Sequence, residues 1–145
     1  MEIENTSLDV WLETLKPFQR KAIKKMLANN GDDEEKVAEL WLSSFGPINT
    51  VTFGGVPTTA SRKNYFQCLK GELNKLICGN DVYEIERTKI LNSGNLVNVA
   101  ASAKIASVIA PIIGISISVL APALVLMLHT ISKMTVNAYC SMIKQ

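Results

Sequence analysis

The chain has 145 residues, enough for one domain that closes its own core without metal or disulfide support. That length argues against a multidomain machine. Hydrophobic residues make up 48% and charged residues 19%, a balance that argues against intrinsic disorder. The charges are unevenly placed: residues 1–104 contain 13 Lys or Arg and 13 Asp or Glu, whereas residues 105–145 contain only Lys133, Lys144 and the single His129. We therefore divide the chain into an amphipathic region, 1–97, and an apolar region, 98–145.

The N-terminus is acidic and polar, which is unlike the basic start and early apolar stretch of a secretory signal. A cytoplasmic N-terminal region is the resulting expectation. The three cysteines are odd in number, and Cys68 and Cys78 would lie about 15 Å apart on a shared helix. They predict reduced, mostly buried thiols rather than a disulfide framework or a metal site.

Helical spacing of apolar residues over 7–29 predicts two consecutive helices bent at Lys16-Pro17. Asn29-Asn30-Gly31 ends the second helix. Asp32 followed by Glu35 resembles a capping box, which predicts that a further helix starts there and runs to about Ser44.

Gly46-Pro47 opens an irregular stretch, Gly46 to Thr59, for which a structural connector is the leading interpretation. Anion binding by its backbone and contact with a partner are the alternatives. Two more helices are predicted, one from Ser61 to Cys78 and one from about Asp81 to Leu91. The second of these is expected to bury Val82, Ile85, Ile90 and Leu91.

The stretch from Ile105 to Ser132 holds 28 residues without an Asp, Glu, Lys or Arg. About 20 apolar helical residues cross a bilayer core. The Ile, Leu and Val side chains of this stretch contribute on the order of 4 to 8 kcal/mol toward insertion. A membrane segment is the favoured interpretation. The alternative is a core helix wrapped by the amphipathic helices, divided into shorter pieces at Pro111 and Pro122.

Small residues recur through the same stretch at spacings of three and four, which would align them on one helical face. Such a stripe lets helices approach closely, so it is a candidate face for self-association or for packing within the chain. Its members are Ala103, Ser107, Ala110, Gly114, Ser118 and Ala121, preceded by Ala100.

Catalytic and metal-binding residues are not indicated by the sequence. His129 is followed by no acidic residue that would orient it, so we interpret it as a core or boundary histidine. The acidic run Asp32 to Glu35 is interpreted as a helix cap. The candidate contact surface for a protein partner or lipid is instead a basic cluster in the second helix: Lys16, Arg20, Lys21, Lys24 and Lys25.

The sequence thus predicts an all-α bundle of four or five amphipathic helices followed by a C-terminal apolar helix or helical hairpin. We expect a non-enzymatic, membrane-associated accessory or effector subunit without cofactor, which binds a protein partner, itself, or both. Nucleic acid and small-molecule substrates are not indicated. The alternative is a cytoplasmic helical adaptor or homo-oligomer whose apolar segment is buried in its own core.

Overall fold

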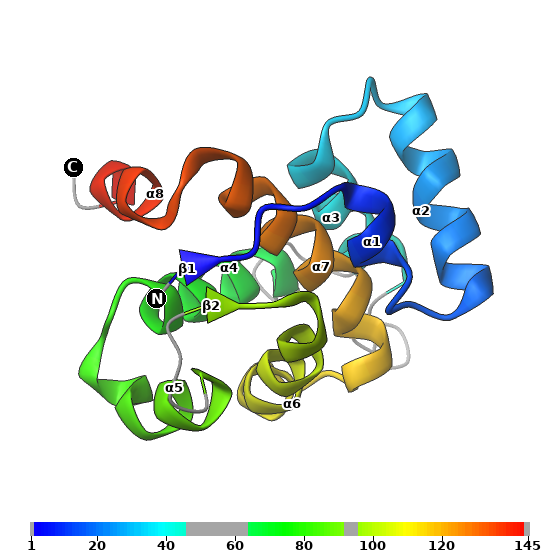
Figure 1. The fold of residues 1–145 in the computed structure, drawn as a ribbon. Coiled ribbons are helices and arrows are strands. Elements are labelled where there is room, and N and C mark those ends of the chain that lie inside the picture. The colour runs from blue at the N-terminus through cyan, green and yellow to red at the C-terminus, as the bar shows by residue number, and fades with distance from the viewer. Residues whose placement is uncertain (1, 46–63, 92–95, 144–145) are drawn as a thin grey trace, which may run out of the picture.

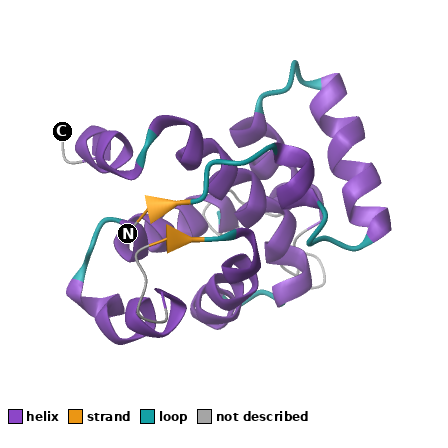
Figure 2. Ribbon diagram, in the orientation of Figure 1, coloured by secondary structure: helices purple, strands orange, loops and turns teal. Residues whose placement is uncertain are grey.

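The computed structural model describes residues 2–45, 64–91 and 96–143. They form an all-α bundle, with one pair of very short strands among the described residues (Figure 2). This confirms the predicted fold class. The elements in chain order are β1 (Glu2–Ile3), α1 (Leu8–Leu12), α2 (Pro17–Asn29), α3 (Glu34–Phe45), α4 (Tyr65–Ile77), the 3-10 turn η2 (Asp81–Tyr83), α5 (Glu84–Leu91), β2 (Leu96–Val97), the 3-10 turn η3 (Val99–Ala101), α6 (Ser102–Ile113), α7 (Ile117–Met134) and α8 (Val136–Ile143).

Helix α7 lies at the centre of the molecule, with other helices on several sides of it (Figure 1). It packs against α1, α2, α3, α6, α8 and β1, and its contact with α3 is the most extensive. Every residue from Pro122 to His129 is buried. Among the described helices, α7 is the one whose length and apolar composition would suffice to cross a membrane. Its apolar side chains are mostly covered here by the rest of the chain.

The predicted apolar segment forms a hairpin of two helices. Helix α6 ends at Gly114, whose φ of 92° is left-handed, a conformation that glycine adopts without the Cβ clash of other residues. Ser116 then caps α7 by accepting a hydrogen bond from the Val119 N–H. Both prolines lie inside helices, Pro111 in α6 and Pro122 in α7. The stretch from Ile105 to Ser132 is therefore divided by the turn at 114–116. The prediction that Pro111 and Pro122 divide it is wrong.

Several helix starts differ slightly from their predicted positions. Asp33, not Asp32, caps α3, because its Oδ1 accepts the Lys36 N–H at 3.1 Å, while Asp32 occupies the preceding turn with a φ of 60°. Asn64 caps α4 by accepting the Gln67 N–H at 3.0 Å. The predicted cap Ser61 and the stretch Gly46 to Thr59 lie outside the described residues.

Helix α5 shows the clearest error in predicted burial. Val82 and Ile85 were expected in the core, yet they are 71% and 68% exposed. Tyr83 is buried in their place, and its hydroxyl donates a hydrogen bond to Glu72 Oε2. The 3-10 turn that precedes α5 advances each residue by 120°, so the phase of an unbroken α-helix does not apply to the start of this segment.

The strands β1 and β2 pair in parallel, Glu2 opposite Leu96 and Ile3 opposite Val97. Glu4 extends the connection, since its N–H donates to the Val97 carbonyl at 2.8 Å and its carboxylate accepts the Val99 N–H at 3.0 Å. The first residues of the chain are thereby fixed beside the entry to α6 (Figure 1). Parallel pairing joins segments distant in sequence, which explains why no local pattern predicted it.

Candidate functional site

The basic cluster lies on α2 and the residue before it, and the structure orients its members differently from the predicted face. Lys16, Arg20 and Lys24 were expected to act together at spacings of four. Arg20 is half-buried, and Lys24 Nζ lies 3.5 Å from Asp9 of α1. Lys21 and Lys25 point away from the buried face of α2, which is formed by Gln19, Ile23 and Leu27.

Gln19 joins the start of α2 to the start of α7. Pro122 has no N–H, so the Ser118 carbonyl lacks the donor that a regular helix supplies four residues later. The Gln19 side-chain amide fills this position and donates to that carbonyl at 2.8 Å. Gln19 also accepts the Lys16 N–H at 3.2 Å, so one buried side chain caps α2 and completes α7.

A second long side chain joins α3 to the same end of α7. The indole Nε1 of Trp41 donates to the Val119 carbonyl at 2.8 Å, and the ring is buried. Polar contacts from α2 and α3 thus hold α7 in register.

A buried ionic cluster lies toward the other end of α7. Glu34 at the start of α3 contacts His129 Nδ1 through one carboxylate oxygen and Lys133 Nζ through the other. Glu34 is 7% exposed and His129 is 8% exposed, whereas the Lys133 side chain reaches solvent. Burial of His129 agrees with its predicted role in the core, but the expectation that it has no acidic partner is wrong. The partner comes from 95 residues earlier in the chain.

The acidic run lies at a helix start as predicted, with Asp33 accepting the cap hydrogen bond and Glu34 and Glu35 in the first turn of α3, but Glu34 also faces α7. A cavity of about 210 Å³ lies nearby, between β1 and the junction of α7 and α8. Its lining residues are Glu2, Ile3, Asn5, Ser132, Thr135, Val136 and Asn137. Neither Glu34 nor His129 lines this cavity, and within the described ranges no group of three His, Cys, Asp or Glu side chains could hold a metal ion.

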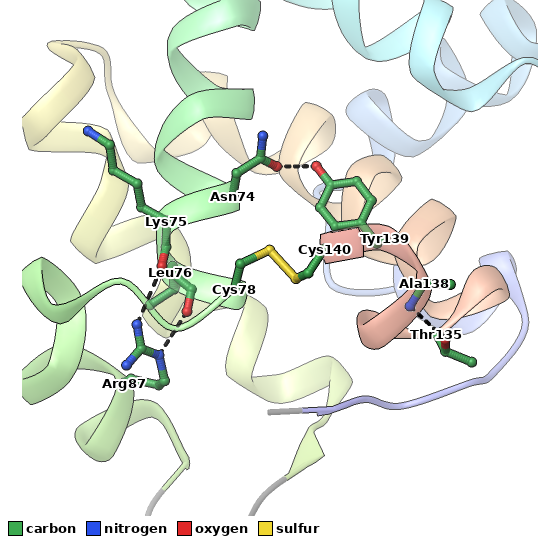
Figure 3. The surroundings of a disulfide bond; sticks show 9 residues. All are labelled: Asn74, Lys75, Leu76, Cys78, Arg87, Thr135, Ala138, Tyr139 and Cys140. Carbon is green, nitrogen blue, oxygen red and sulfur yellow. Dashed lines mark hydrogen bonds between the residues drawn. A yellow bond between two sulfur atoms is a disulfide. The ribbon is translucent and has the colours of Figure 1, made fainter. Parts of the chain in front are cut away.

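A disulfide joins the end of α4 to α8 through Cys78 and Cys140, with their Cα atoms 5.6 Å apart (Figure 3). The prediction of reduced thiols is therefore wrong for these two residues, and Cys68 is the free one. The helical separation of Cys68 and Cys78 sets no limit on the distance from Cys78 to Cys140. Thr135, with a φ of 74°, breaks the helical path after α7, and the chain then returns along α4, which brings Cys140 to Cys78.

Tyr139 reinforces the same junction, because its hydroxyl donates to Asn74 Oδ1 (Figure 3). Burial, and then the negative charge of Glu35, raises the pKa of Tyr139 to about 12. Opposite the disulfide, Arg87 donates from Nε to the Leu76 carbonyl at 2.8 Å, which caps the C-terminal end of α4 with a positive charge.

The small-residue stripe does not run along one helix, because its members divide between α6 and α7 at the Gly114 turn. Ala103 and Ser107 are exposed on α6, Ala110 is buried, and Ser118 is exposed at the start of α7. Ala121 is half-buried against the core. Self-association through this stripe stays a prediction, with Ala103, Ser107, Gly114 and Ser118 as its accessible residues.

Comparison with known proteins gives no match: no family model, no curated protein and no solved structure resembles this chain at a significant level.

Proposed function

We propose that this protein is a non-enzymatic helical interaction module whose uncharged C-terminal segment serves as the core of its own fold. The observation that carries the proposal is the enclosure of α7 by α1, α3 and α6. A bilayer anchor would need those same side chains to face lipid, and releasing α7 would expose the apolar faces of its neighbours.

The surroundings of His129 support a non-enzymatic role. General acid–base catalysis needs a side chain within reach of a substrate proton. His129 is the chain's single histidine, it is buried, and its Nδ1 is engaged by Glu34. This ionic cluster serves to join α3 to α7.

Partner binding is assigned in this proposal to the exposed apolar pair Val82 and Ile85. The two residues are three positions apart and are the most exposed of the large aliphatic side chains in the described part of the chain. Apolar side chains at the centre of a protein interface supply much of its binding energy. A protein partner is therefore expected at η2 and α5.

A membrane-anchored accessory or effector subunit is the second candidate, favoured by the length and apolar composition of α7. Fractionation separates the two. The proposed module is released into the aqueous phase without detergent, and both tryptophans emit at short wavelength because Trp11 and Trp41 are buried. Retention through an alkaline carbonate wash would refute the proposal in favour of the anchor.

The partner surface is tested by a pull-down from the native cells with the whole chain and with a Val82→Ser, Ile85→Ser variant. A specific partner should be retained by the parent chain and lost from the variant. Ile112→Ser is the matched control, since Ile112 is also exposed, at 52%, but lies on α6. A partner that binds the Val82→Ser, Ile85→Ser variant as well as it binds the parent chain would contradict this placement of the surface.

A further inference from the structure

The outward face of α2 combines cations with an aromatic side chain. Phe18, Lys21 and Lys25 are spaced by three and four residues and lie opposite the buried face of the helix. Phe18 is 65% exposed, although burying a phenylalanine side chain stabilises a folded protein. The exposed face of α2 therefore combines an apolar side chain with positive charges.

The α6–α7 turn places a second exposed apolar side chain close to the start of α2. The hydrogen bond between Gln19 and the Ser118 carbonyl fixes the start of α2 beside the start of α7 (Figure 1). The residue before Gln19 is Phe18, and the residue before Ser118 is Ile117. Both are exposed apolar residues, and Ile117 is 48% exposed. Two segments distant in sequence therefore present apolar groups at one junction.

The positive charge on this face is largely uncompensated. Residues 16–29 contain five Lys or Arg and no Asp or Glu. Lys24 contacts Asp9 of α1, and among the described residues neither Lys21 nor Lys25 forms an ion pair. A lysine is attracted to the surface of an anionic membrane. A lipid bilayer also takes up apolar side chains below its headgroups, which a nucleic-acid backbone does not offer to the aliphatic Ile117.

We propose that a lipid-docking face, formed by Phe18, Lys21 and Lys25 of α2 together with Ile117 at the neighbouring start of α7, binds the folded protein to the surface of an anionic bilayer. The lysines lie at the headgroups, and Phe18 and Ile117 enter the boundary of the acyl chains. Helix α7 stays in the core throughout, so the docking goes beyond the proposed function and does not depend on it.

The test is vesicle flotation of the purified whole chain, with phosphatidylcholine alone and with an equal mixture of phosphatidylcholine and phosphatidylglycerol. The protein should float with the anionic vesicles and be released by high salt, because salt screens the charges of exposed groups. Lys21→Glu with Lys25→Glu should weaken binding by more than about tenfold. Phe18→Ser, which keeps every charge, should weaken it severalfold.

Matched controls place the effect on this face. Lys89→Glu with Lys104→Glu changes the net charge equally on the exposed surfaces of α5 and α6, and Met142→Ser removes a similarly exposed apolar side chain from α8. These controls should bind as the parent does, and circular dichroism checks that each variant is folded. Equal binding to neutral vesicles, or unchanged binding by the charge-reversal variant, would overturn the proposal.

The same variants are measured against a labelled DNA duplex. A protein that binds the duplex but not the anionic vesicles would have a nucleic-acid surface here, and this result would overturn the proposal. Failure of docking leaves α7 in the core and the proposed function intact. Vesicle binding that resists alkaline carbonate would instead contradict the proposed function, which makes the two failures distinguishable.

Discussion

Removing the Cys78–Cys140 disulfide should lower stability by an amount that can be worked from its position. The bond closes a loop across a sequence separation of 62 residues. The chain-entropy relation for a loop of that size gives a stabilisation of about 4 kcal/mol. For a chain of this length, that corresponds to a fall in Tm of roughly 10 °C.

The assay is thermal unfolding, followed by circular dichroism, of the parent chain and of Cys78→Ser and Cys140→Ser. Cys68→Ser is the matched control, because Cys68 is on the same helix as the Cys78 junction but is free. Thiol titration of unreduced, denatured protein should detect Cys68 alone. Three reactive thiols, or disulfide variants as stable as the Cys68 control, would refute the reasoning.

Three further predictions concern the contacts of α7 and α8. Gln19→Ala should destabilise the fold by about 1 kcal/mol in urea unfolding. The loss should be smaller in a Pro122→Ala background, where residue 122 regains an N–H for the Ser118 carbonyl. Equal losses in both backgrounds would show that Gln19 does not replace the N–H that Pro122 lacks. In chemical denaturation, Glu34→Ala should lower the free energy of unfolding by roughly 3–5 kcal/mol, because it breaks a buried ionic cluster. Glu35→Ala should lower it by less than about 1 kcal/mol, because the ion pair of Glu35 is partly exposed. The pKa of Tyr139 is raised from 10.0 to about 12, so the unfolded chain ionises at a lower pH than the folded one. The contribution of Tyr139 to stability is therefore complete below pH 10 and is lost as the pH rises toward 12. Tyr139→Phe should flatten the pH dependence of urea unfolding in this window, and an unchanged slope would contradict the assignment.

The periodicity of apolar residues was sufficient to predict the all-α fold and the bend before α2. A local signal explains the bend: Pro17 begins a helix because its missing N–H is not needed there. The errors arise where two distant segments meet. Cys78 pairs with Cys140 and Glu34 pairs with His129 only because α8 and α3 pack where they do.

The candidate surface was partly accessible from sequence. The cluster of lysines in residues 16–25 is visible as composition, but which of them face outward depends on the side of α2 that is buried. Phe18 lies within the helical spacing of apolar residues over 7–29, and its exposure depends on the packing of α2. The same holds for Val82 and Ile85, where a 3-10 turn shifts the phase of the helix.

The position of α7 near the C-terminus also bears on how the protein folds during synthesis. Helices α1 and α3 bury their apolar sides largely against α7, which begins at Ile117. A growing chain exposes these surfaces until α7 has left the ribosome. Assembly of these helices therefore follows the synthesis of α7, and truncations that remove residues beyond 116 leave α1 and α3 without the helix on which they assemble.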